Sequence, residues 1–307
     1  MSRMTTSGAL IAALCWCPLL LGQQASLRAS VAKEEFFEGE PVFIVFQLQN
    51  EGFDTVWIAP FALPFQNLRV TVTRSDGAVL KQLGFVADFF PGLASRGEPL
   101  GPGESTFTTV VMQDYWGEPG PSAPNLFLHD LKTGDYQLTA WFQLHGESSS
   151  QSVTDSIQAP PVSFRIRLRT PAEEGAFAEV KSIRDMAWSP GDRRRYLSAL
   201  INWTSQHAAS DAANPYLPFL LHNGLQTAWA IGQPQDAKTA SQVRQLRSTI
   251  VEHERTTPGG SYLVTAIAEE SPALLDELIA RLEPSLVASV ARSLKHRGID
   301  THRRLPK

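Results

Sequence analysis

The sequence predicts a β-then-α protein: an N-terminal antiparallel β-sandwich followed by an irregular all-α helical array. Before Thr170, apolar and polar residues alternate between turns rich in Gly, Pro and Asp, which is typical of half-buried strands. After Thr170, apolar residues recur every three to four positions. Several of these runs open at a Ser, Thr or Asn followed by Pro, which is typical of capped helices. A chain of 307 residues is long enough for two domains with separate cores.

The N-terminus has the pattern of a secretory signal peptide, assigned to residues 1–25. Arg3 and the free amine supply positive charge, and the run from Ala9 to Leu21 is apolar but too short to span a bilayer. Cys15 and Cys17 each follow a bulky residue, whereas a lipoprotein signal has a small one there. We therefore expect a secreted or periplasmic protein, without a lipid anchor and without a membrane span after cleavage. An uncleaved interfacial anchor is the alternative.

The composition disfavours several classes of function. The net charge of −4 gives no electrostatic basis for binding nucleic acid. Both cysteines lie in the predicted signal peptide, so the mature chain would contain no disulfide, no thiol nucleophile and no Cys-based zinc site. In an oxidising compartment, the stability of the fold would then depend on burial alone.

Seven or eight short segments between residues 27 and 169 have the pattern of strands. The first, Leu27–Phe36, is expected at an edge, and the second, Val42–Gln49, is apolar nearly throughout, as expected at the centre of a sandwich. The turn Ser75-Asp76-Gly77 separates two alternating runs and predicts a β-hairpin. The other segments are Thr55–Ala59, Leu68–Thr73, Ala78–Leu83, Glu104–Met112, Tyr136–Leu144 and Val162–Leu168.

The segment from Asp130 to Tyr136 is a turn that delivers a Tyr to the start of an alternating strand. It resembles the tyrosine corner of immunoglobulin-like domains, in which the phenol bonds to an upstream backbone group. An antibody-type domain would have Cys two residues later, where this chain has Leu138. Trp57 falls where the buried Trp of the third strand would lie. The resemblance implies an immunoglobulin-like sandwich over residues 27–169, without the disulfide.

Residues from about 40 to 145 resemble, more closely, sandwich domains of the type seen in the intracellular proteinase inhibitor of bacilli and in many secreted bacterial proteins. This resemblance is carried mostly by turn residues, so it implies a fold more than an activity. An inhibitory role would require a protease-binding loop, which the sequence does not identify. The matching segments are the Val42–Asn50 strand ending in Gln49-Asn50, Ser75-Asp76-Gly77, Leu100-Gly101-Pro102-Gly103-Glu104-Ser105 and Thr133-Gly134-Asp135-Tyr136.

Two long connections hold the candidate binding residues Phe89, Phe90, Tyr115 and Trp116. Sandwich loops gather at the domain ends and carry binding residues, and Tyr115-Trp116 would offer a flat stacking face to a sugar or a peptide. The alternative is that these aromatic residues pack beneath their loops as a small hydrophobic cluster. Nearby acidic residues lack a short Asp-x-Asp spacing, so we expect no metal site, and no cofactor motif is present.

The helical array is assigned to residues 171–298, and it follows the last strand with little or no linker. Thr170-Pro171-Ala172-Glu173 has the form of a capping box, with Pro at the first helical position. Similar patterns predict helix starts near 190, 215 and 272, and weaker ones predict starts near 237, 260 and 285. About seven helices are expected to stack in antiparallel pairs. Residues 299–307 form a basic tail.

No recognisable catalytic or metal-binding motif is present in the sequence. It therefore favours a non-enzymatic interaction module that binds a protein or a glycan at the cell envelope. One alternative is a protease inhibitor or regulator that acts through a loop at the end of the sandwich. A second alternative is a hydrolase with its site between the two domains, which would require a nucleophile and a base to converge there.

Overall fold

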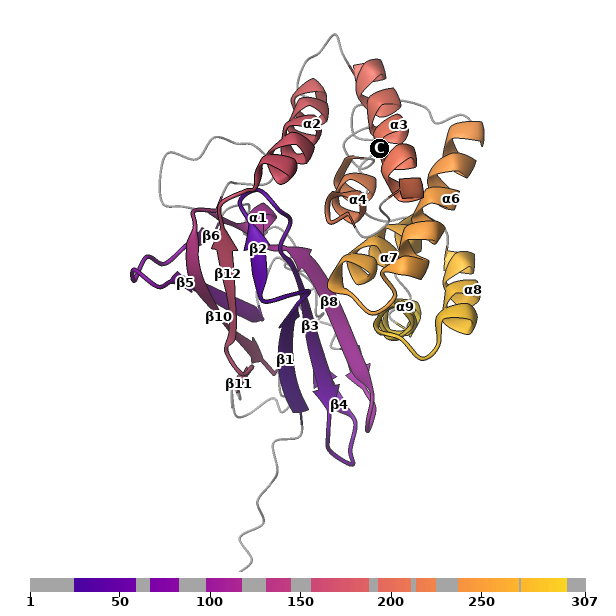
Figure 1. Ribbon diagram of the computed structural model, residues 1–307. Helices are drawn as coiled ribbons and strands as arrows, with labels where there is room; N and C mark the ends of the chain where they lie inside the picture. The colour runs from indigo at the N-terminus through magenta and orange to yellow at the C-terminus, as the bar shows by residue number, and fades with distance from the viewer. Residues whose placement is uncertain are drawn as a thin grey trace, which may run out of the picture.

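The computed structural model describes residues 25–58, 67–82, 98–117, 131–144, 156–187, 193–210, 214–224, 237–270 and 272–296. Antiparallel and mixed β-sheets form its N-terminal half, and helices form its C-terminal half (Figure 1). The β-then-α order predicted from the sequence is therefore confirmed. The predicted signal peptide, apart from Ala25, and the predicted basic tail lie outside the described residues. Within these ranges, no helix is long and apolar enough to cross a membrane.

The first sheet has three antiparallel strands in the order β1 (Ala25–Val31), β3 (Phe43–Asn50) and β8 (Ser105–Val111). The middle strand, β3, is the apolar segment that the sequence placed at the centre. Its alternate side chains enter two different cores. Ile44, Phe46 and Leu48 are buried with the residues of the second sheet.

Phe43 and Val45, the intervening residues of β3, are buried with the helices. A strand that is covered on both faces needs apolar residues at every position. This explains why the sequence Phe43-Ile44-Val45-Phe46 shows no alternation.

The second sheet is built around β10 (Gly134–Gln143). One edge of β10 pairs antiparallel with β5 (Leu68–Arg74). The other edge pairs antiparallel with β12 (Val162–Arg167) and then with β11 (Ser156–Gln158). The short strand β2 (Glu35–Phe37) pairs parallel with β12, which makes this sheet mixed.

The remaining β elements are short ribbons. β4 (Val56–Ile58) pairs with β7 (Glu98–Leu100), and β6 (Lys81–Gln82) pairs with β9 (Trp116–Gly117). A single helical turn, α1 (Met112–Tyr115), joins β8 to β9. The sequence did not predict β7, β9, β11 or α1, because each has only two to four residues and shows no measurable periodicity.

The predicted hairpin turn at Ser75-Asp76-Gly77 is confirmed. The backbone N–H of Arg74 donates to the carbonyl of Ala78 at 2.8 Å, and Gly77 has a φ of 86°. The Asp76 carboxylate accepts a hydrogen bond from the N–H of Ala78 at 3.0 Å. A positive φ at the third turn residue is the position for which glycine carries the smallest cost.

The predicted edge strand Leu27–Phe36 is wrong as a single strand. The chain bends after β1 and re-forms as β2, so that the first piece pairs with β3 and the second with β12. Alternation alone could not show this change of sheet, since both pieces keep the period of a strand. The switch is decided by which neighbouring strand offers a free edge.

The helices begin close to the predicted positions. They are α2 (Pro171–Ala187), α3 (Arg193–Ser210), α4 (Tyr216–Phe219) followed by the π-helical turn η1 (Leu220–Gly224), α6 (Ala237–His253), α7 (Pro258–Glu270), α8 (Pro272–Leu282) and α9 (Leu286–His296).

Two of the predicted caps can be seen as hydrogen bonds. The Glu173 carboxylate accepts from the N–H of Thr170 at 2.7 Å, and the Thr170 hydroxyl accepts from the N–H of Glu173 at 3.4 Å, so the capping box is confirmed. Before α4, the side-chain oxygen of Asn214 accepts from the N–H of Tyr216 at 3.0 Å. Both caps satisfy helix N–H groups that have no partner within the helix.

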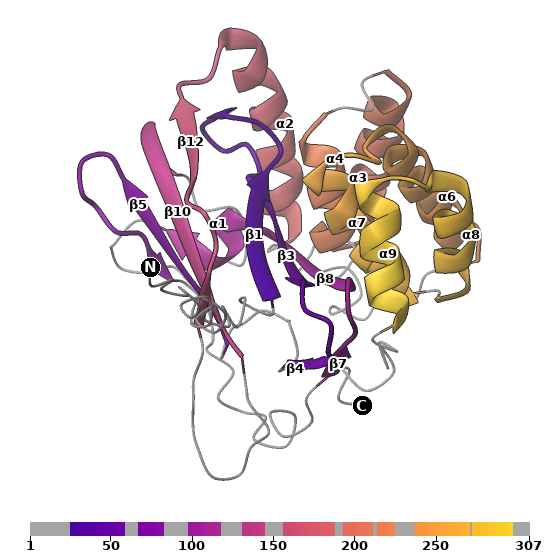
Figure 2. The same ribbon diagram turned by 90° about the horizontal axis from the view of Figure 1, so that it is seen from below.

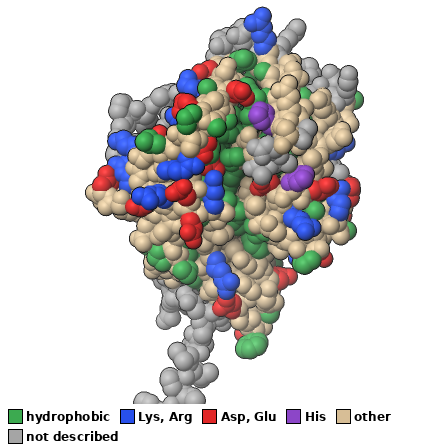
Figure 3. Space-filling view, viewed as in Figure 1, with side chains coloured by type: hydrophobic (Ala, Val, Ile, Leu, Met, Phe, Trp, Pro, Cys, Tyr) green, Lys and Arg blue, Asp and Glu red, His purple; other side chains and the backbone are tan. Residues whose placement is uncertain are grey.

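The helices cover the outer face of the first sheet, whereas the second sheet lies on the other side of it (Figures 1 and 2). The ring of Phe43 lies 5.2 Å from that of Tyr262 in α7. The hydroxyl of Ser293 in α9 accepts a hydrogen bond from the backbone N–H of Phe107 at 3.2 Å. Hydrophobic side chains follow this boundary in Figure 3. The helices and the first sheet therefore share one continuous apolar core.

Candidate functional site

The structure places the predicted stacking pair Tyr115-Trp116 against the core of the β half. Trp116 is 1% exposed, and the partly buried Tyr115 packs on the same cluster. Burial, with a smaller contribution from Asp114, raises the pKa of Tyr115 to about 12. Trp116 therefore does not present the exposed flat face that we expected. Phe89 and Phe90 lie outside the described residues.

Trp57 is not the buried core tryptophan that the resemblance to immunoglobulin-like domains implied. It lies on β4, which pairs with β7 and not with either main sheet, and 44% of the residue is exposed. Val56 and Ile58 on each side of it are buried. Because side chains alternate along a strand, burial of these two neighbours turns Trp57 outward.

The side chain of Asn50, at the end of β3, holds the turn that leads into β4. Asn50 is fully buried. Its amide nitrogen donates to the carbonyl of Asp54 and to the carbonyl of Leu100, both at 2.8 Å. Its amide oxygen accepts from the N–H of Gly52 at 2.9 Å. One buried amide thus fixes a turn and joins it to the strand β7.

The backbone of Asn50 is also paired with the turn between β7 and β8. Its N–H donates to the carbonyl of Glu104, and its carbonyl accepts from the N–H of Gly103, both at 2.9 Å. The Glu104 carboxylate accepts from the N–H of Gly101 at 2.7 Å, which closes the second turn. The two turns therefore support each other and form one end of the β half.

Phe53 lies at the tip of this supported turn and is 97% exposed. We call residues 50–54 the Phe53 turn. Exposed carboxylates of Glu51, Asp54 and Glu104 lie on the same two turns. A nearly fully exposed aromatic ring on a hydrogen-bonded turn is a strong candidate for a contact residue. The sequence Asn50-Glu51-Gly52-Phe53-Asp54 indicates a turn, but only the structure shows that its aromatic residue points into solvent.

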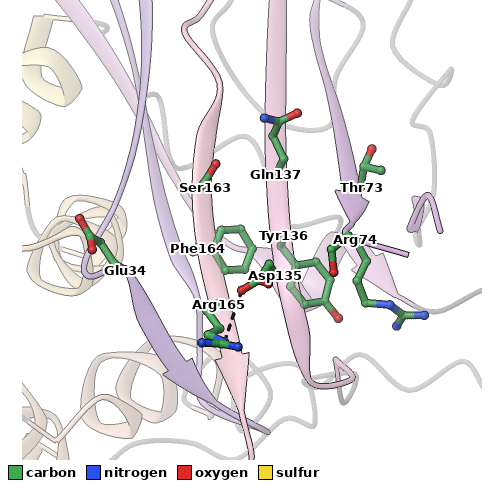
Figure 4. Close-up of a pocket in the computed structure, with 10 residues that line it drawn as sticks. Glu34, Thr73, Arg74, Asp135, Tyr136, Gln137, Ser163, Phe164 and Arg165 are labelled. Carbon is green, nitrogen blue, oxygen red and sulfur yellow. Dashed lines mark ion pairs between the residues drawn. The ribbon is translucent and has the colours of Figure 1, made fainter. Parts of the chain in front are cut away.

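A second candidate surface lies on the outer face of the second sheet. An open hollow of about 600 Å³ is lined mainly by residues of three neighbouring strands, β5, β10 and β12. Figure 4 shows these residues. Asp135 and Arg165, which both line the hollow, form an ion pair at 3.3 Å, and the side chains of both are more than half exposed. Thr73, Gln137 and Ser163 form the next row of the sheet. No local sequence pattern marks this surface, because its residues come from three strands that are distant in the chain.

Near the boundary between the sheets and the helices, the titratable side chain of His222 is enclosed by packed residues. His222, on η1, is buried and its ring lies 4.4 Å from that of Tyr262. Burial, together with the positive charge of Arg247, lowers the pKa of His222 to about 3, so its imidazole is neutral at pH 7. Among the described residues, no group of three His, Cys, Asp or Glu side chains could hold a metal ion.

Comparisons with known proteins provide little further information. No model of a known protein family matches the chain, and no curated protein matches it. Among solved structures, the chain is similar to one titled as that of AvmM, which catalyses macrocyclization in alchivemycin A biosynthesis. The two chains share 14% sequence identity, and the match covers 49% of this chain and 92% of that one with a TM-score of 0.25. A likeness this weak carries no conclusion about fold or function.

Proposed function

We propose that this protein is a non-enzymatic interaction module that acts in the periplasm or after secretion and binds a protein partner through the Phe53 turn. The observation that carries this proposal is the near-complete exposure of the Phe53 ring on a turn held by the buried Asn50. Full burial of a Phe side chain contributes roughly 1.5–3 kcal/mol. A turn that is already ordered loses little conformational entropy when a partner binds.

The charges around the Phe53 turn indicate the kind of partner that would fit. Glu51, Asp54 and Glu104 give the turn an acidic rim. Arg28 forms an ion pair with Glu51 at 3.8 Å, so the four charges together remain negative. An apolar pocket with basic residues at its edge would complement this surface in shape and in charge. An anionic membrane surface would be repelled by the same carboxylates.

The proposal includes an immunoglobulin-like fold for the β half. Three features support it. β1 pairs with β3 while β2 pairs parallel with the last strand β12, which is the split expected of a first strand that is shared between two sheets. β10 lies between β5 and β12. The hydroxyl of Tyr136 donates to the carbonyl of Lys132 at 2.6 Å, as in a tyrosine corner.

The proposed location rests on the signal-peptide pattern of residues 1–25. Cleavage before Ala25 would leave β1 complete, because Ala25 is buried and pairs with Asn50. N-terminal sequencing of the protein recovered from the extracytoplasmic fraction of the producing cells tests this point. A mature chain that begins between residues 23 and 26 is expected, and recovery of Met1 in the cytoplasmic fraction would contradict it.

Site-specific crosslinking tests the binding role of the turn. A photoreactive phenylalanine analogue at position 53 keeps the aromatic ring in place, and the same analogue at the exposed Leu168 is the matched control. We expect a crosslinked protein from position 53 that is absent from position 168 and is lost when unlabelled wild-type protein competes. Equal crosslinking from the two positions, or none from position 53, would contradict the proposal.

A protease inhibitor is the second candidate, because a rigid and exposed loop is also what inhibition requires. In that case Phe53 would enter the hydrophobic specificity pocket of a chymotrypsin-like protease. The wild-type protein should then inhibit chymotrypsin and not trypsin, and Phe53→Arg should reverse this preference. Rapid cleavage after Phe53 without inhibition would contradict the protease-inhibitor function and would not contradict the interaction module.

A further inference from the structure

We propose that the outer face of the second sheet binds a neutral, hydroxyl-rich ligand: a short oligosaccharide that lies along β10. This surface is separate from the Phe53 turn, and the inference does not depend on the function proposed for that turn. It rests on three properties of the hollow in Figure 4: its position, its hydrogen-bonding groups and its balance of charge.

The position of the hollow makes it rigid and accessible. It spans three adjacent strands, and β10 in the middle is hydrogen-bonded along both edges. The helices lie on the opposite side of the molecule, beyond the first sheet (Figure 2). Side chains on such a sheet are held at a strand spacing of about 4.8 Å. A ligand would therefore meet groups whose positions are fixed before it binds.

The central row of the hollow consists of neutral hydrogen-bonding groups. Gln137 on β10 lies directly opposite Thr73 on β5 and opposite Ser163 on β12. One amide between two hydroxyls supplies donors and acceptors together, which suits the hydroxyl groups of a sugar, since each of these also donates and accepts. The next row towards the other end of β10 continues this chemistry with Thr139 opposite Thr71.

The charged residues of the hollow cancel one another. Its lining contains two carboxylates, Glu34 and Asp135, and two guanidinium groups, Arg74 and Arg165. Asp135 pairs with Arg165 at 3.3 Å, and Arg74 pairs with Asp76 at 2.7 Å. Two carboxylates against two guanidinium groups give the lining a formal charge of zero, and Asp76 adds one negative charge just outside it. This surface gives no net attraction to a phosphate or a nucleic acid, and it lacks the dense negative charge that would bind a polycation. The chemistry therefore favours a neutral ligand over an ionic one.

Trp141 extends this surface along β10. Asp135, Gln137, Thr139 and Trp141 alternate with buried residues, so all four lie on the outer side of the strand. Trp141 is only partly exposed and lies opposite Arg69 and Gln158. An indole ring can cover the apolar face of a sugar. The distance from Asp135 to Trp141 is roughly 20 Å along the strand, which is the length of several sugar units and not of one.

Titration with neutral tetrasaccharides tests the inference. The probes are the tetramers of glucose (α- and β-linked) and of N-acetylglucosamine, and binding is measured by calorimetry on the full chain. We expect at least one to bind, and we expect the double variant Gln137→Ala/Ser163→Ala to weaken it at least tenfold, since several hydrogen bonds are lost. Both residues are exposed, so the variant should remain folded.

The control variant is Lys181→Ala, an exposed side chain on α2 that belongs to neither proposed surface, which should leave the affinity unchanged. Failure of the wild-type protein to bind any of these tetrasaccharides would overturn the inference. Binding that the double variant retains would overturn the placement on β10. Stronger binding of a polyuronate tetramer, or of an extended peptide of four residues, would overturn the ligand class. None of these outcomes would affect the interaction proposed for Phe53.

Discussion

Gly39 illustrates how one residue controls the contact between the β half and the first long helix. It has a φ of 76°, and a Cβ atom built on it would lie 2.3 Å from the ring of Phe177 in α2. That ring is in turn covered by the guanidinium of Arg169, 4.1 Å from its centroid. The position therefore requires glycine for two reasons: its backbone conformation and the space that the Phe177 ring occupies.

Substitution of Gly39 should lower the stability of the fold through both the backbone conformation and the clash with Phe177. Gly39→Ala should lower the free energy of unfolding by about 2–4 kcal/mol, because backbone strain is added to a steric clash. Gly77→Ala is the matched control: its φ is 86° but nothing lies within 4 Å of the added carbon. We expect it to cost about 1 kcal/mol. Urea unfolding of both variants gives the comparison, and equal losses would show that the Phe177 contact contributes nothing.

At the scale of the element, the start of α2 shows how local sequence and distant contacts combine. The capping box between Thr170 and Glu173 could be predicted from four consecutive residues. Arg167 could not: it donates to both oxygens of Glu173, at 2.6 and 2.7 Å, and to Glu35 of β2 at 3.0 Å. The carboxylate that caps the helix therefore also ties it to the edge of the second sheet.

This second role of Glu173 should appear in the pH dependence of stability. Hydrogen bonds from Arg167 and Thr170 lower the pKa of Glu173 to about 2, below its usual value of 4.5. Its contribution is therefore complete above pH 4.5 and is lost as the pH falls towards 2. Glu173→Gln should lower the free energy of unfolding by about 1 kcal/mol at pH 7. The difference in this free energy between the variant and the wild type should shrink as the pH falls from 4.5 towards 2.

Glu174→Gln is the control for this measurement. Glu174 is exposed and forms an ion pair with Arg169 at 2.6 Å, so its replacement should change the free energy of unfolding by less than about 1 kcal/mol. Thermal unfolding at several pH values between 2 and 7 provides the data. A constant difference between the wild type and Glu173→Gln down to pH 2 would contradict the role assigned to Arg167.

At the scale of the whole molecule, the first sheet belongs to two cores at once. β3 contributes alternate side chains to the core between the sheets and to the core beneath the helices. Contacts such as Phe43 with Tyr262 and Phe37 with Tyr216 join the two halves through packed rings. If the helices were joined to the β half only by a flexible linker, a loss of packing in one half would not reach the other.

Truncation of Phe43 should therefore loosen both halves. Phe43→Ala removes a buried ring and should lower the free energy of unfolding by about 3–5 kcal/mol. Hydrogen exchange of backbone amides, followed by mass spectrometry, should become faster in α7 as well as in β3. Leu168→Ser, at an exposed position, should change neither the free energy of unfolding nor the exchange rates in β3 and α7. Faster exchange in β3 with an unchanged α7 would contradict the shared core.

The order of strands and helices, the Ser75-Asp76-Gly77 hairpin and the helix starts at Pro171 and Tyr216 all follow from periodicity and turn chemistry, which act over a few neighbouring residues. The exposure of Phe53, the burial of Trp116 and the division of the first strand between two sheets depend on partners far along the chain. The row across Gln137 likewise exists only once β5, β10 and β12 are aligned. Such long-range pairings leave no local pattern, so tertiary packing alone decided where this protein presents its candidate binding surfaces.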